Sequence, residues 1–182
     1  MISHRSSPTE HKLLVLYAMN GLGPATAEQL LRFFVDRDQM NYIDLQLSLA
    51  ELREGGLLRR QIHPLGVLYQ PTAEGIETLN MFWKRIPYSR RLSVDDALMS
   101  WRAKFSHERH VLHKTSPLPD GAVEVRLSVL EEDDMLMELI IRAPDDERAE
   151  QFCESWTKNA GVLYSMILRA LNDPRGAPYL SQ

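Results

Sequence analysis

The chain has 182 residues, of which 44% are hydrophobic and 25% charged, and its formal net charge is −4. This composition is typical of a globular protein and argues against disorder, and no apolar run approaches the roughly 18 residues of a membrane helix. Cys153 is the only cysteine, which excludes an internal disulfide or a multi-cysteine zinc site, and residues 1–5 lack the pattern of a signal peptide, so we expect a cytoplasmic protein without membrane contact.

Charge is distributed unevenly along the chain. Residues 1–114 contain 15 Lys and Arg against 12 Asp and Glu, whereas residues 115–182 contain 6 against 13. Within the first part, residues 84–114 carry 8 basic residues against 3 acidic ones. Because an acidic segment repels phosphate, any contact with nucleic acid is expected from the residues before 115.

Three helices are predicted at the start of the chain. The first spans His11–Asn20. The second begins after Thr26, whose hydroxyl can form a capping box with Gln29, and the third begins after Asn41, a good N-cap. Leucines recur in the third helix at intervals of four and three residues and indicate one buried stripe: Leu45, Leu49 and Leu52.

A two-stranded ribbon is predicted after the third helix. Gly55 and Gly56 can end that helix, and a turn at His63–Gly66 separates two runs short enough to be strands. Helix, helix and hairpin in this order predict a winged helix-turn-helix, whose second helix usually enters the DNA major groove. The alternative is a small α+β domain that never meets DNA, since a fold does not determine a function. A fourth helix from Thr72 to Arg85 and a break at Pro87 complete the first expected domain, residues 1–87.

Residues 88–182 are predicted to form a small C-terminal extension of helix, β-hairpin and long helix. A fifth helix is expected to start at Ser93, which can form a capping box with an acid three residues on. Residues 115–121 read as a linker. Alternating apolar residues over Val123–Val129 and Met135–Ile141 then predict an antiparallel hairpin with one buried face. The expected fold class of the whole chain is therefore α+β.

A long helix is predicted after Pro144, with an acidic first turn that suits the helix dipole. Its apolar stripe has members at alternating spacings of four and three residues: Ala149, Cys153, Trp156, Ala160, Leu163, Ile167 and Ala170. A hairpin is not stable alone. The helix must therefore cover the hairpin or pair with its copy in a dimer, and the stripe is wide enough for both.

No catalytic group of residues can be recognised. His107, His110 and His113 are spaced so that their imidazoles could follow one side of a helix as metal ligands, but no acidic cluster completes the set, and solvated histidines are the simpler interpretation. Cys153 lies on the apolar stripe and is expected to be a small core residue. The acidic turn Glu131–Asp134 lacks the glycine of a calcium loop, and the chain has no glycine-rich phosphate loop. We therefore expect neither an enzyme nor a bound metal or cofactor.

The residues that could contact DNA lie on the third helix, the ribbon and the fifth helix. The candidates for base contacts are Asn41, Gln46 and Ser48. The candidates for phosphate contacts on the ribbon are Arg59, Arg60 and His63. The fifth helix adds three more candidates for phosphate: Arg90, Arg91 and Arg102. An ordinary polar surface is the alternative interpretation of all these residues.

Two features of the third helix argue against groove binding. If Leu45 faces the core, Asp44 and Glu51 lie on an outward flank and would repel phosphate, although an acid can accept a hydrogen bond from cytosine. Ile43 and Leu47 lie nearly opposite Leu45. Their side chains would form an exposed apolar patch, which is typical of a contact with a protein partner.

Five stretches carry a likeness to a known family: Asn41-Tyr-Ile-Asp-Leu-Gln46, Leu52-Arg-Glu-Gly-Gly-Leu-Leu58, Thr72-Ala-Glu-Gly75, Arg85-Ile-Pro87 and Phe152-Cys-Glu-Ser-Trp156. With them, nearly the whole chain resembles the bacterial family catalogued as domain of unknown function 4364 (DUF4364), a winged helix like those of PadR and MarR proteins with a small C-terminal α/β extension. The resemblance implies a transcriptional regulator that forms a homodimer, without an established ligand or operator. Polar residues in that family stand where this chain has Asp44 and Leu47.

Two hypotheses for function result. The first is a cytoplasmic, homodimeric winged-helix regulator that binds double-stranded DNA and whose C-terminal hairpin and helix dimerise or sense a partner. The second is a winged helix kept as a protein-interaction module without DNA binding, in which Ile43 and Leu47 contact the partner. The sequence specifies no operator, effector or regulated pathway.

Overall fold

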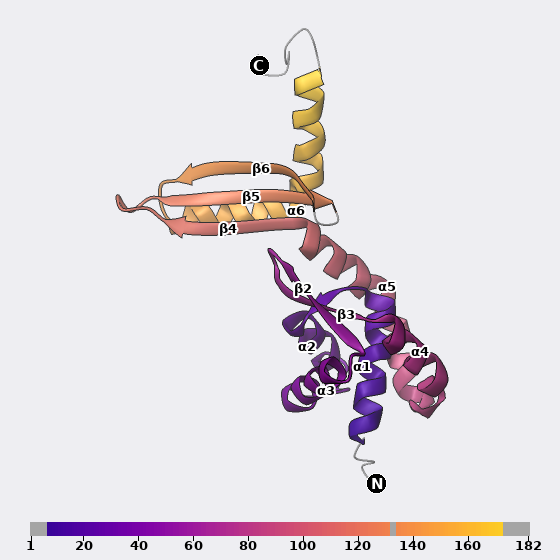
Figure 1. The fold of residues 1–182 in the computed structure, drawn as a ribbon. Coiled ribbons are helices and arrows are strands. Elements are labelled where there is room, and N and C mark those ends of the chain that lie inside the picture. Colours follow the sequence, from indigo (N-terminus) through magenta and orange to yellow (C-terminus); the bar gives the residue numbers. More distant parts are fainter. Residues whose placement is uncertain (1–6, 132–133, 173–182) are drawn as a thin grey trace. The chain divides into compact units, whose positions relative to one another are not determined.

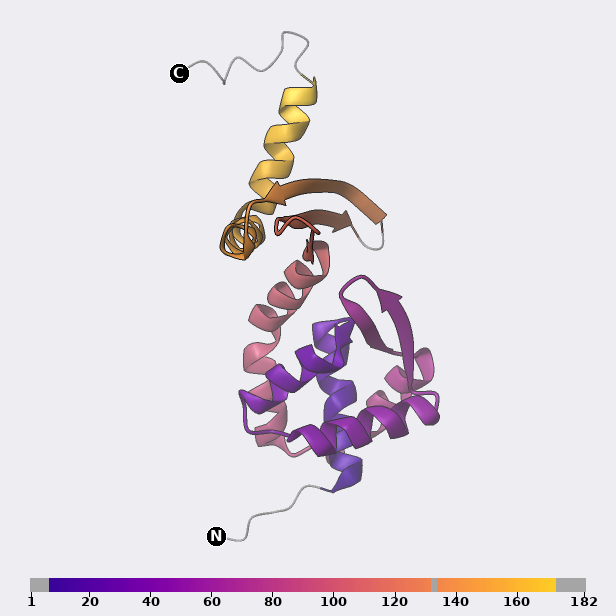
Figure 2. The ribbon, with the colours of Figure 1, turned by 90° about the vertical axis from the view of Figure 1, so that its left-hand side faces the viewer.

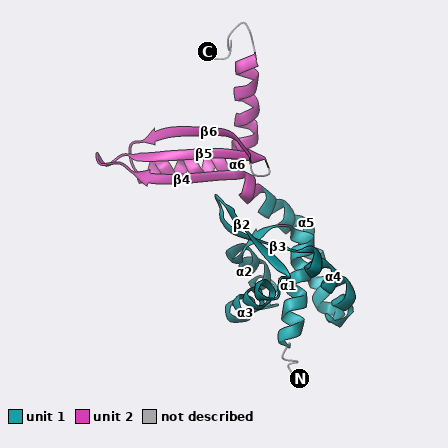
Figure 3. Cartoon of the chain, in the orientation of Figure 1, with its two compact units in different colours: residues 1–106 teal, residues 107–182 magenta. Residues whose placement is uncertain are grey.

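The computed structural model describes residues 7–131 and 134–172, and the chain divides into two compact units, residues 1–106 and 107–182 (Figure 3). The sequence placed a domain boundary at Pro87, before the division between the compact units. The reason for the difference is helix α5 (Tyr88–His110), which buries Val94, Ala97 and Phe105 in the core of the N-terminal unit.

The N-terminal unit consists of helices around a small sheet (Figure 1). Its elements before α5 are α1 (Pro8–Leu22), β1 (Ala25–Thr26), α2 (Ala27–Val35), α3 (Tyr42–Glu54), β2 (Leu58–His63), β3 (Gly66–Pro71), α4 (Ala73–Phe82) and the short 3-10 helix η1 (Trp83–Arg85). The strands pair antiparallel in the order β1-β3-β2. The hairpin β2–β3 is the ribbon that the sequence predicted.

Local chemistry begins α2 and α3 where the sequence indicated, whereas α1 extends beyond the predicted bounds His11–Asn20 because Ser7 caps it and accepts from the Glu10 amide. The Thr26 hydroxyl accepts from the Gln29 amide at 3.1 Å and the Gln29 side chain accepts from the Thr26 amide at 2.9 Å, so the capping box is confirmed. Asn41 caps α3 by accepting from the Asp44 amide at 2.9 Å. After α3, Gly56 adopts a φ of 72°, a conformation that glycine takes at little cost.

A single apolar core holds the N-terminal unit together. The leucine stripe of α3 is confirmed, since its three members are at most 2% exposed: Leu45, Leu49 and Leu52. Aromatic rings join α2 to α5, because Trp101 meets Phe33 and Phe105 edge to face with ring centroids 5.6 and 5.5 Å away. The buried leucines on the inner face of α3 therefore fix its position in this core.

The predicted start of α5 was wrong. The sequence placed it at Ser93, whereas the helix begins at Tyr88. The carbonyl oxygen of Pro87 accepts from the amides of Arg90 and Arg91 at 3.0 and 3.2 Å, so the first turn forms directly after the proline.

The C-terminal unit is a three-stranded antiparallel meander covered by one helix (Figures 1 and 2). Its strands are β4 (Val111–Pro117), β5 (Val123–Glu131) and β6 (Asp134–Ala143), and its helix is α6 (Asp146–Asn172). The predicted hairpin β5–β6 is confirmed, with Leu127 opposite Leu139. Strand β4 was not predicted: it takes in the start of the expected linker at residues 115–121 and pairs Val111 with Val129.

The first part of α6 lies along the sheet and the rest leaves it (Figures 1 and 2). The buried members of the predicted stripe are Ala149, Cys153, Trp156 and Ala160. Trp156 also donates a hydrogen bond from Nε1 to the Leu112 carbonyl at 3.1 Å, which ties the helix to β4. No described residue of α6 beyond Ala160 is buried.

Candidate nucleic-acid interface

Helix α3 presents an apolar face to solvent. Tyr42, Ile43 and Leu47 are each more than half exposed, and Ile43 is exposed by 66%. Gln46 lies on the same side of the helix and is half-buried. The exposed patch expected from Ile43 and Leu47 is therefore present, and Tyr42 extends it.

Asp44 and Glu51 lie on the side of α3 that is next to α1. The Glu51 carboxylate accepts from the Lys12 ammonium at 2.7 Å, and an Asp44 oxygen lies 4.0 Å from His11 Nδ1. Both carboxylates stay accessible, with side-chain exposures of 37% for Asp44 and 49% for Glu51, so the expected acidic flank is present and lies next to α1. The Lys12 ammonium also reduces the repulsion that Glu51 would exert on phosphate.

Burial lowers the pKa of the His11 imidazole below its usual value. The Asp44 carboxylate opposes this effect by favouring the charged ring, and the nearby Arg90 guanidinium adds to the lowering. His11 is therefore a titratable contact between α1 and α3.

Two of the three predicted base-contacting residues are engaged within α3 itself. Asn41 uses both ends of its amide on Asp44, accepting from its backbone amide and donating to its carboxylate, each at 2.9 Å. Ser48 is only 4% exposed and donates to the Asp44 carbonyl at 2.7 Å. Gln46, the third predicted base-contacting residue, lies beside the exposed patch of Tyr42, Ile43 and Leu47.

The β2–β3 hairpin carries two exposed arginines. Arg59 donates to the Gln70 side chain across the strand pair, at 2.7 Å from one terminal nitrogen and 3.3 Å from Nε. Arg60 is exposed, and since successive strand residues face opposite sides, the two guanidinium groups lie on opposite faces of the hairpin. His63, the third residue predicted there, is 6% exposed and accepts from the Leu65 amide through Nδ1 at 3.1 Å.

The three arginines of α5 that were predicted to contact phosphate have different surroundings. Arg90 donates to the side chain of Gln39 at 2.9 Å and to its backbone carbonyl, so it fastens the segment between α2 and α3. Arg91 stacks over the Trp83 ring at 4.4 Å and donates to the Ile86 carbonyl at 3.2 Å. Arg102 is exposed and lines a shallow depression beside Gly21 of α1.

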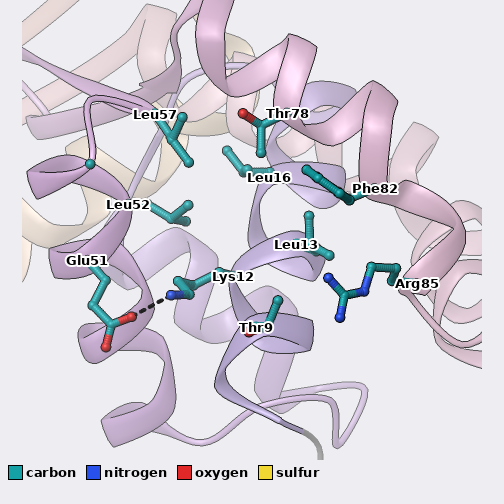
Figure 4. A pocket seen from close by; sticks show the side chains of 11 residues that line it. Thr9, Lys12, Leu13, Leu16, Glu51, Leu52, Leu57, Thr78, Phe82 and Arg85 are labelled. Carbon is teal, nitrogen blue, oxygen red and sulfur yellow. Dashed lines mark hydrogen bonds and ion pairs between the residues drawn. The ribbon is translucent and has the colours of Figure 1, made fainter.

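A groove that the sequence did not indicate lies between α1, the end of α3 and α4 (Figure 4). Its volume is about 340 Å³, and its apolar lining comes from Leu13, Leu16, Leu52, Leu57 and Phe82. The Lys12–Glu51 pair and Arg85 lie at its edge. Its residues come from distant parts of the chain, so no local pattern could have revealed it.

The residues considered for catalysis or metal binding belong to the C-terminal unit. His107 contacts the Thr157 carbonyl through Nε2 at 2.8 Å, and burial raises the pKa of the Cys153 thiol, with a further contribution from Glu150. Over residues 7–131 and 134–172, no three His, Cys, Asp or Glu side chains come together as a metal site. Part of the predicted acidic turn at Glu131–Asp134 lies outside the described residues.

The elements define an α+β protein in which a helical unit with a small antiparallel sheet precedes a three-stranded meander covered by a long helix. Residues 11–171 match the model of the family described as Domain of unknown function (DUF4364), and the chain belongs to this family. The membership that the resemblance predicted is thus confirmed. No curated protein matches the chain significantly, and neither does any solved structure. In the described part of the chain, no helix has both the length and the apolar character to cross a membrane.

Proposed function

We propose that the N-terminal unit is a winged helix-turn-helix that binds double-stranded DNA, and that the protein is a transcriptional regulator without catalytic activity that acts in the cytoplasm. The observation that carries this proposal is the order of elements, α1-β1-α2-α3-β2-β3, with antiparallel strands in the order β1-β3-β2. In a winged helix-turn-helix, the helix at the position of α3 enters the major groove. Regulators of this kind often read two half-sites, so the proposal includes a homodimer.

The exposed face of α3 supports a particular kind of base readout. In the major groove, apolar side chains contact the C5-methyl group of thymine, and a glutamine can pair with adenine N6 and N7. Ile43 and Leu47 would supply the methyl contacts, with Gln46 beside them. The proposal therefore includes a preference for A·T base pairs.

Phosphate contacts would come from exposed cations of the same unit. Arg59 and Arg60 project from the hairpin directly after α3, and Arg102 is exposed on α5. The engaged positions of Arg90 and Arg91 make them supports of the fold in this proposal.

The test is fluorescence anisotropy of labelled duplexes at several salt concentrations. We expect binding that weakens with salt, and a change of Arg59→Ala with Arg60→Ala should lower the slope of log K against log salt by about 0.9 for each phosphate that the variant no longer neutralises. Lys158→Ala, an exposed cation of the C-terminal unit, is the matched control and should leave the slope unchanged. No binding to any duplex at low salt would overturn the proposal.

Base readout is tested separately by replacing thymine with uracil, which removes only the C5-methyl group. We expect a duplex of A·T pairs to bind more tightly than its uracil counterpart. Ile43→Ala with Leu47→Ala should remove that difference while leaving the salt slope in place.

A second candidate is a winged helix that binds a protein and not DNA. The exposed apolar face of Tyr42, Ile43 and Leu47 favours this candidate, because an apolar patch of this kind is typical of a protein interface. Under this hypothesis the duplexes do not bind, and Leu47→Glu abolishes a protein complex without changing the free energy of unfolding.

A further inference from the structure

The two parts of α6 differ in how their side chains are distributed. Residues 146–160 are amphipathic, with a buried stripe against the sheet and charged residues on the other side: Asp146, Glu147, Arg148, Glu150, Glu154 and Lys158. This is the usual pattern of a surface helix that packs on its own core. Full burial ends at Ala160, and the next member of the stripe, Leu163, is only half-buried against the same core.

Residues 161–172 are apolar on nearly every side. At 3.6 residues per turn, the polar Ser165, Arg169 and Asn172 fall on one narrow side and the apolar residues cover the rest. Val162 and Met166, one turn apart, are 62% and 59% exposed. A helix that is apolar all round is normally buried. Figures 1 and 2 show this segment extending away from the sheet of its own unit.

The charge of the segment limits what can cover it. Between positions 161 and 172 the ionisable residues are Tyr164 and Arg169. The segment therefore has too few charges to pair with a strongly charged partner surface. The segment is also too short for a bilayer, which takes about 20 residues of helix. A partner must therefore offer an apolar surface with little charge.

A second copy of the chain offers such a surface. A two-fold contact needs only a surface that is complementary to itself. In an antiparallel pair of these segments, the two Arg169 side chains lie toward opposite ends, so the pair avoids like-charge repulsion. We propose that residues 161–172 of α6 pair with the same segment of a second chain and form the dimer contact. This inference deepens the proposed homodimer but does not depend on DNA binding.

The experiment measures the mass of the full chain in solution, without DNA, by light scattering or sedimentation over a range of concentrations. We expect the wild-type protein to have twice the mass of one chain. Val162→Glu with Met166→Glu should give the mass of one chain, with a dissociation constant raised by about a hundredfold or more. Because both side chains are exposed, the variant should keep the far-UV circular dichroism spectrum and the thermal transitions of the monomer.

The matched control adds the same charges on the polar side of the helix. Ser165→Glu with Asn172→Glu should remain dimeric. A wild-type protein that is monomeric at every concentration would overturn the inference and would indicate that another part of the chain or another protein covers the segment. A dimer that Val162→Glu with Met166→Glu does not weaken would overturn it as well, since the contact would lie elsewhere. Neither result bears on whether the N-terminal unit binds duplex DNA.

Discussion

Helix α3 and the end of α6 both expose large apolar side chains, but only α3 also buries side chains fully in the core of its own unit. On α3, the exposed Leu47 lies two residues from the fully buried Leu45. In residues 161–172 of α6, no residue is buried. The core thus determines where α3 lies whatever its outer face contacts, whereas residues 161–172 touch the core of their unit only at their beginning, through the half-buried Leu163, and a short helical segment with so little packing is marginal in water. The same surface chemistry therefore lies on a fixed scaffold in α3 and on a weakly packed helix end in α6, which is why we propose a binding surface for the first and a dimer contact for the second.

The largest effect is expected where α6 is anchored. Trp156→Ala should destabilise the C-terminal unit by about 3–5 kcal/mol, because it opens a cavity under the helix. It also leaves the Leu112 carbonyl without its indole donor. Met166→Ala, in the exposed part, should change the free energy of unfolding by less than about 0.5 kcal/mol in dilute protein. Urea unfolding followed by far-UV circular dichroism measures both, and equal losses of stability would contradict the contrast within α6.

A pair of substitutions two residues apart tests the contrast within α3. Leu45→Ala should cost about 2–5 kcal/mol because the side chain is removed from the closely packed core. Leu47→Ala should cost less than about 0.5 kcal/mol, since its side chain already contacts water. The measurement is urea unfolding of the N-terminal unit. A large destabilisation by Leu47→Ala would mean that α3 is rotated about its axis relative to the arrangement described above.

Features that depend on neighbouring residues were predictable from the sequence. The capping box of Thr26 and Gln29, the cap at Asn41 and the buried leucines of α3 need only residues within a turn or two. The alternation in β5 and β6 likewise reveals the hairpin. Each of these patterns depends only on the local backbone conformation, and the structure confirms each of them.

Features that depend on distant residues were missed. Strand β4 forms because β5 offers it a partner, and its polar residues 113–116 hide the alternation. The pairing of Glu51 with Lys12 joins residues 39 positions apart, so the sequence could not reveal this contact between α3 and α1. Ser48 was misplaced for a different and local reason: its hydroxyl donates to the Asp44 carbonyl one turn earlier, so the side chain needs no contact with solvent. The exposed apolar face of α3 was therefore predictable, whereas the pairing of its polar side chains was not.

The smallest effect concerns the contact between α1 and α3 and depends on pH. Because burial lowers the pKa of His11, the unfolded chain binds a proton at this site more readily than the folded chain. Stability should therefore fall as pH decreases through about 6.5, the ordinary value for histidine, and the decrease should level off below the pKa of the folded chain. The Asp44 carboxylate, 4.0 Å from Nδ1, limits the decrease by favouring the charged ring.

His11→Gln tests this dependence because it removes the titrating group and keeps a polar side chain. The free energy of unfolding of this variant should change less than that of the wild type between about pH 7 and about pH 5. His113→Gln, which changes an exposed histidine of the C-terminal unit, should retain the wild-type pH dependence. If His11→Gln also retained it, the titration of His11 would not be coupled to the packing of α3 on α1, and the exposed face of α3 would be held by its leucines alone.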